Sequence, residues 1–187
     1  MSPLQIGTIQ RPARGERICG DALLVLKGEV TTVAIADGLG HGPEAAKASN
    51  PFCAYVEENM GQALPQLMKG AAQALRGTRG AAAAILRIRH KEQSLEFVGV
   101  GNIEFKSLSR SAISPFSSPG IVGRGRMRLK VFDYPLNEGD LLVMFSDGIS
   151  NRFDLDPFAH LPPHAIAERL LDEHGKHHDD ATCVVMR

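Results

Sequence analysis

Six short apolar runs recur along the chain, each rich in Val, Ile, Leu or Ala and bounded by polar or turn-forming residues. Runs of this length and composition predict buried β-strands. Two connectors, KGE at 27–29 and RHKEQS at 89–94, are too short for a crossover helix, so the strands they join should pair antiparallel. The runs are ALLVL from Ala22, TTVAIA from Thr31, AAAAILRI from Ala81, LEFVGV from Leu95, LLVMFS from Leu141 and ATCVVM from Ala181.

Two other segments predict helices. Residues 43–74 should form two helices, because Pro51 and Pro65 would each disrupt a helix interior. Another helix should start after Pro162 and Pro163 and end near Gly175, with an apolar stripe on one face. Strands and helices in separate blocks indicate an α+β fold in which helices pack on mainly antiparallel sheets.

The segment from residue 106 to 130 is rich in Ser, Gly, Pro and Arg and predicts a long exposed loop that enters a strand near Met127. Its basic part, RGRMRLK at 124–130, is typical of an alternating solvent-exposed strand, and docking of a phosphoprotein is the alternative. Nucleic acid is disfavoured as a partner, because no aromatic residues are interleaved and the formal net charge is zero.

Length and composition narrow the class of protein. The 187 residues suffice for a single domain, 1–187. The three cysteines are odd in number and lack a CxxC pair, which argues against a disulfide framework and a cysteine zinc site and favours a cytoplasmic location. No apolar run approaches the roughly 20 residues that span a bilayer, so no membrane partner is expected.

Aspartates flank four of the predicted strands. Asp37 and Asp147 follow strands, whereas Asp21 and the pair Asp179–Asp180 precede them. In an antiparallel sheet the exit of one strand lies beside the entry of its neighbour, so these residues should gather at one edge of the fold. If KGE forms the turn, Asp21 lies opposite the Ala36–Asp37 corner at about 5 Å.

Two carboxylates this close repel, so either one is protonated or a cation lies between them. An oxygen-only cluster suits Mg²⁺ or Mn²⁺, and two such ions about 3.5–4 Å apart would hold a hydroxide for attack on phosphorus. The alternative is that each aspartate only caps a turn, which is the favoured interpretation of any one such motif taken alone. The four together favour a phosphoryl-hydrolysis site.

Six motifs also resemble the metal-dependent protein phosphatase (type 2C) family, in the family's order and over nearly the whole chain. They are GERICGD ending at Asp21, ADGLGHG around Asp37, RGAAAAILRI from Arg79, GVGN ending at Asn102, FSDGI around Asp147 and HHDDATCVVM around Asp179. The chain is most similar to the small bacterial stand-alone branch that serves stress responses. The resemblance implies an αββα sandwich with two Mn²⁺ or Mg²⁺ ions at one sheet edge.

The resemblance also implies roles for individual residues. Asp37 would bridge both ions and hold the attacking hydroxide, with the other metal ligands supplied by Asp21, the Gly38 carbonyl, Asp147 and Asp179. Asn102 and Asp180 would support these ligands.

Two positions depart from the family pattern. Larger relatives carry a histidine directly after the DG pair as general acid, and here His41 comes two residues later. They also carry a phosphate-clamping arginine before the first acidic ligand, and here Arg14 and Arg17 lie nearby at another spacing. His41 is therefore the candidate catalytic acid, and Arg14 and Arg17 are the candidate phosphate or substrate contacts.

Two functions follow as hypotheses. The first is a protein serine/threonine phosphatase whose partners are phosphorylated regulatory proteins, namely stressosome scaffold components of the RsbS and RsbR type, so that it resets a stress response. The second is a catalytically weak binding module of the same fold that sequesters a regulatory partner. The complete aspartate set favours the first.

Overall fold

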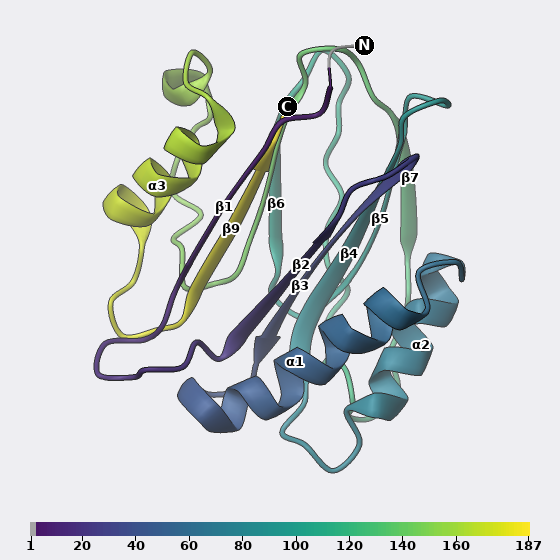
Figure 1. The fold of residues 1–187 in the computed structure, drawn as a ribbon, viewed down its shortest axis with the longest axis vertical. Coiled ribbons are helices and arrows are strands. Elements are labelled where there is room, and N and C mark those ends of the chain that lie inside the picture. Colours follow the sequence, from purple (N-terminus) through teal and green to yellow (C-terminus); the bar gives the residue numbers. More distant parts are fainter. Residues whose placement is uncertain (1–2) are drawn as a thin grey trace.

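Two antiparallel β-sheets pack face to face between helices in the computed structural model, which describes residues 3–187 (Figure 1). The five-stranded sheet has the order β2 (Asp21–Leu26), β3 (Val30–Gly38), β4 (Ala81–Arg89), β5 (Ser94–Val100) and β7 (Val131–Pro135). The four-stranded sheet has the order β1 (Ile6–Arg11), β9 (Ala181–Met186), β8 (Leu141–Phe145) and β6 (Glu104–Leu108). The predicted αββα sandwich is confirmed.

The alternation of side chains along the strands builds the layers. In β3, Val33 and Ile35 face the other sheet, where they share a core with Met144 and Val184. Ala34 and Ala36, which alternate with them, face the helices on the outer side. A separate core lies between the four-stranded sheet and its helix. Central strands are therefore buried on both faces, which explains their continuous apolar sequences.

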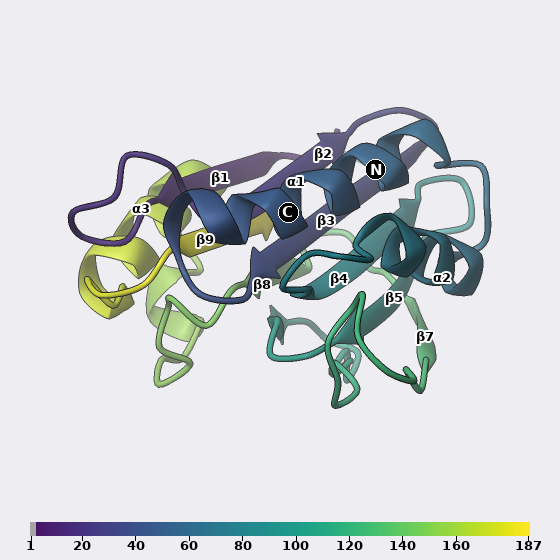
Figure 2. The same ribbon diagram turned by 90° about the horizontal axis from the view of Figure 1, so that it is seen from below.

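Three α-helices cover the outer faces: α1 (Gly42–Glu58), α2 (Leu64–Ala74) and α3 (Pro163–His174). Figure 2 shows α1 and α2 lying over the five-stranded sheet, and α3 beside β1 and β9. The predicted pair of helices in 43–74 is confirmed, but Pro51 lies inside α1 and does not end it. Pro65 lies in the first turn of α2, where a missing N–H costs little.

Two strands, β1 and β6, were missing from the sequence prediction, and a third, β7, was predicted with the wrong start. Each lies at the edge of its sheet and is only partly buried, so polar residues interrupt its apolar pattern. The expected loop over 106–130 was wrong in its first part, because β6 extends to Leu108. Its exit strand begins at Val131 and not near Met127.

No helix in residues 3–187 is long and apolar enough to cross a membrane.

Candidate metal centre

The predicted aspartates meet at one end of the sandwich. The β2–β3 hairpin pairs Asp21 directly with Asp37, as the turn KGE predicted to within a residue. In the other sheet Asp147 follows β8 and Asp179 precedes its neighbour β9. A cavity of about 340 Å³ between these strand ends is lined by Asp37, Asp147 and Asp179, with Asn102 and His41 beside them.

Burial and mutual repulsion both raise the pKa values of the aspartates in this cluster. Burial raises the pKa of Asp37 to about 9, with further contributions from Asp21, Asp147 and Asp179. Burial is also the main cause that raises the pKa of Asp21, to about 6, and that of Asp179. Within residues 3–187 none of the four forms an ion pair with a cationic side chain. The cluster therefore favours either protons or a bound cation at neutral pH.

Asp21 is held in place by the opposite sheet and keeps one oxygen unpaired. The Ser146 hydroxyl donates to Asp21 Oδ2 at 2.7 Å, and Ser146 Oγ in turn accepts the Thr182 N–H at 2.9 Å. Asp21 Oδ1 is buried without a hydrogen-bond partner. An unpaired buried carboxylate oxygen is costly, and either a proton or a bound cation satisfies it.

The donor chemistry fits hard divalent cations, because all the side-chain donors are carboxylate oxygens. Asp21, Asp37, Asp147 and Asp179 would hold the ions, together with the predicted Gly38 carbonyl. Within the described residues no three Asp, Glu, His or Cys side chains already surround one common point. The fit therefore rests on the type of donor and on the unpaired Asp21 oxygen.

Two neighbours support the cluster. Asn102 Nδ2 donates to Asp147 Oδ2 at 2.7 Å. Asp180 uses both oxygens within the protein: Oδ1 accepts the Ala13 N–H at 2.9 Å and Oδ2 accepts the Gly42 N–H at 3.2 Å. Asp180 thus ties the β1–β2 loop to the start of α1, in keeping with a supporting position beside Asp179.

The packing of α1 explains why residue 38 is glycine, which the sequence alone did not reveal. A Cβ at this position would lie 2.0 Å from the Ala45 carbonyl oxygen, so only glycine lets α1 approach the end of β3 so closely. Its proposed role as a carbonyl ligand stays a prediction.

The candidate acid and the candidate phosphate contacts have different positions. His41 lines the cavity, and its Nδ1 lies 2.9 Å from Glu16 Oε1, a partner that sequence reasoning missed. Arg14 and Arg17 are exposed on the β1–β2 loop and do not line the cavity.

Three further residues near the site lie in the family motifs, but the sequence assigned them no role of their own. Ser146 precedes Asp147, and its hydroxyl donates to Asp21. His178 precedes Asp179 and lines the cavity. The Arg79 guanidinium covers Gly40 at the rim, since a Cβ there would lie 2.7 Å from Arg79 Nη1. The sequence places Ser146 and His178 next to aspartates, but only the three-dimensional fold brings Ser146 to Asp21 and Arg79 to Gly40.

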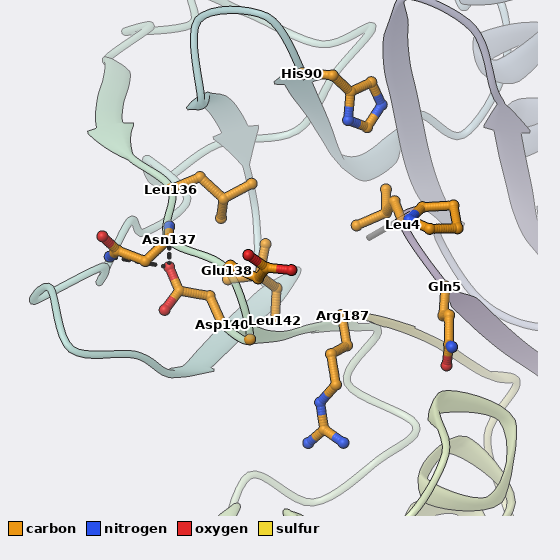
Figure 3. Close-up of a pocket in the computed structure, with 11 residues that line it drawn as sticks. Leu4, Gln5, His90, Leu136, Asn137, Glu138, Asp140, Leu142 and Arg187 are labelled. Carbon is orange, nitrogen blue, oxygen red and sulfur yellow. Dashed lines mark hydrogen bonds between the residues drawn. The ribbon is translucent and has the colours of Figure 1, made fainter. Parts of the chain in front are cut away.

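A second cavity, of about 270 Å³, lies where the β4–β5 turn, the β7–β8 loop and the two chain ends meet (Figure 3). Its Asp140 accepts the Asn137 N–H at 2.8 Å through Oδ2, which caps the turn before β8. Arg187 donates to the carbonyls of Ala159 and Leu161. These polar groups are already engaged in the fold, in contrast to the aspartate cluster.

A two-sheet sandwich with helices on both outer faces and strand-end aspartates is the architecture of type 2C protein phosphatases. RsbX in complex with magnesium has a TM-score of 0.89 and 22% identity, covering 98% of this chain and 94% of that one. The phosphatase domain of SpoIIE from Bacillus subtilis has a TM-score of 0.82 and 24% identity, covering 98% and 63%. At these identities the two structures establish the fold.

Sequence comparisons extend this result. Residues 27–187 match the family described as Stage II sporulation protein E (SpoIIE). A chain from a structure of the bacterial stressosome is 35% identical over the full length of both chains, with a TM-score of 0.95. The phosphoserine phosphatase RsbX of Bacillus subtilis (strain 168) is 26% identical over 150 residues, which cover 79% of this chain and 75% of RsbX.

The chain therefore belongs to the SpoIIE family of type 2C phosphatase domains. It is a protein serine/threonine phosphatase, and phosphatases of the type 2C family need divalent metals.

Proposed function

We propose that this phosphatase removes phosphate from phosphoserine or phosphothreonine of stressosome proteins of the RsbS and RsbR type, and that it uses two Mn²⁺ or Mg²⁺ ions. The observation that carries the metal requirement is the aspartate cluster, with its raised pKa values and the unpaired buried oxygen of Asp21. The substrate class is supported by the similarity to RsbX and to a chain whose structure was determined in work on the bacterial stressosome.

When bound, the two ions would neutralise the cluster and activate a water molecule for in-line attack on phosphorus. The residues of the chain have separate tasks in this proposal. Asp37 interacts with the other three aspartates, and its carboxylate would help to hold the ions. Ser146 and Asn102 fix the orientation of Asp21 and Asp147 through their hydrogen bonds.

His41 protonates the departing seryl or threonyl oxygen in this proposal. Its Nδ1 is engaged by Glu16, which leaves Nε2 as the ring nitrogen available to the cavity. Arg14 and Arg17 contact the phosphate or nearby parts of the substrate. They lie on the loop that Asp180 anchors through the Ala13 N–H.

The test is to incubate the purified protein with MnCl₂ and phosphorylated proteins of the RsbS and RsbR type, and to follow each phosphosite by mass spectrometry. We expect loss of phosphate that stops with EDTA and resumes with excess Mn²⁺. Dephosphorylation that continues in EDTA would contradict the metal requirement. Full biological activity of Asp147→Asn would favour the sequestering binding module.

A further inference from the structure

The basic segment at residues 124–130 starts in a turn, where the Arg124 N–H donates to the Ile121 carbonyl, and its residues 126–130 belong to neither sheet. Its exposure alternates: Met127 and Leu129 are partly buried against the core beneath α1 and α2, whereas Arg126, Arg128 and Lys130 are exposed. This period of two is that of a β-strand with one face on the protein and one in solvent. The apolar face anchors the segment and leaves its cations outward.

The backbone of this segment is open. No hydrogen bond from or to the backbone of residues 126–129 occurs within the described part of the chain. The segment leads directly into β7, which is the outermost strand of the five-stranded sheet (Figure 1). Unpaired N–H and C=O groups next to a sheet edge are the template on which an extended peptide adds as a strand.

The exposed side chains make the segment selective for negative charge. Arg124, Arg126 and Arg128 form no ion pair within residues 3–187. Lys130 lies over the Phe116 and Phe132 rings, 4.9 and 4.6 Å from their centroids. A row of cations without counter-ions attracts an acidic partner and disfavours a basic one.

The segment is also fixed relative to the catalytic cavity. The loop that precedes it is hydrogen-bonded to the sheet, through Ala81 with Val122 at 3.1 and 2.8 Å and through Ser118 with Gly99 at 2.8 Å. Ala82, which follows Ala81, lines the cavity of the aspartates. A substrate whose phosphoserine enters the cavity can therefore lie along this side of the molecule.

We infer that residues 124–130 bind an extended acidic segment of the phosphoprotein substrate by strand addition, with Arg126 and Arg128 contacting its carboxylates. This inference rests on the proposed function and adds the feature of the substrate that the enzyme recognises outside the phosphosite.

The test compares two synthetic phosphoserine peptides, one flanked by four glutamates and one flanked by four glutamines. For the wild type we expect kcat/KM to be about tenfold higher for the acidic peptide at low salt. The preference should disappear in Arg126→Glu/Arg128→Glu and decline as salt increases. Lys130 is left unchanged because it packs on the two aromatic rings.

A matched control carries the same change in charge elsewhere. Lys27→Glu/Lys91→Glu reverses two exposed lysines in the β2–β3 and β4–β5 turns. It should keep the preference for the acidic peptide. Equal kcat/KM for both peptides in the wild type, or equal loss of preference in both double variants, would overturn the inference. Hydrolysis of neither peptide would instead contradict the proposed function.

Strand addition has its own readout, which does not depend on turnover. The acidic peptide without phosphate should slow hydrogen–deuterium exchange of the amides in residues 125–130, because their N–H groups become bonded. Unchanged exchange at peptide concentrations that saturate binding would exclude strand addition. A single-stranded oligonucleotide that binds more tightly than the acidic peptide would also overturn the inference, in favour of a nucleic-acid site.

Discussion

The two ends of this sandwich carry the same residue type at equivalent places, with opposite consequences. Asp140 immediately precedes β8 at one end, as Asp21 begins β2 and Asp179 shortly precedes β9 at the other. Asp140 is buried, but it accepts the Asn137 N–H and caps a turn. Asp21 is equally buried, yet one of its oxygens has no partner and its nearest charged neighbours are other aspartates.

The two ends differ in which residues surround each aspartate in the fold, and not in the local sequence around it. Each aspartate taken alone fits a turn, and at Asp140 this interpretation is the correct one. At the other end four strands from two sheets bring their aspartates together, and no cationic side chain in residues 3–187 compensates them. A buried cluster of like charge that the fold does not neutralise indicates a site that a ligand completes.

The largest expected effect is a difference in catalytic activity between variants at the two ends. Asp37→Asn should lower Mn²⁺-dependent hydrolysis of p-nitrophenyl phosphate by more than about 100-fold, since loss of a supporting residue around a metal already costs 10–100-fold. Asp140→Asn should change kcat/KM of the folded enzyme less than about twofold and lower its Tm by about 2–4 °C, because a turn-capping hydrogen bond is worth about 1 kcal/mol. Steady-state kinetics and thermal unfolding measure both.

These two variants control for one another. A large activity loss in Asp140→Asn, with its fold intact by circular dichroism, would mean that the far end also participates in catalysis. Activity retained in Asp37→Asn would remove Asp37 from the centre of the proposed mechanism.

The second prediction concerns the effect of cations on stability. Mg²⁺ or Mn²⁺ at about 100 times its Kd should stabilise the wild type by about 2.7 kcal/mol, which corresponds to about 5–10 °C in Tm. Asp140→Asn should show the same shift, because Asp140 lies at the end of the sandwich away from the proposed ion site. Asp37→Asn should show little of it. Equal shifts in all three proteins would place the stabilising ion away from the aspartate cluster.

Much of this arrangement could be predicted from the chain. The central strands could be predicted from their continuous apolar runs. The three-residue turn KGE predicted, to within a residue, the register that pairs Asp21 with Asp37. Edge strands such as β6 could not be found in this way, because their half-exposed sequences lack an apolar run.

The supporting contacts were beyond sequence reasoning for a different reason. Ser146 meets Asp21 across two sheets and 125 positions of sequence, and Glu16 meets His41 from a separate loop. Such pairs depend on how the sheets stack, which no local pattern records. The cluster was therefore predictable, whereas the residues that orient it were not.

The last prediction concerns a dependence of stability on pH that belongs to the aspartate end alone. The pKa of Asp37 is raised from 3.8 to about 9 in the folded, metal-free protein. A carboxyl with a raised pKa binds its proton more tightly in the folded state, so its stabilising contribution is complete below about pH 4 and is lost as the pH rises towards 9. Asparagine at this position does not titrate.

The Tm of metal-free Asp37→Asn should therefore exceed that of the metal-free wild type by a margin that grows between pH 5 and pH 8, by about 8 °C or more. Differential scanning calorimetry in EDTA measures this margin, and comparison of the two proteins cancels the titration of all other groups. A margin that stays constant over this range would mean that Asp37 is already ionised at pH 5. The repulsion that distinguishes the two ends would then be relieved within the protein itself, and the reason to expect a cation there would be lost.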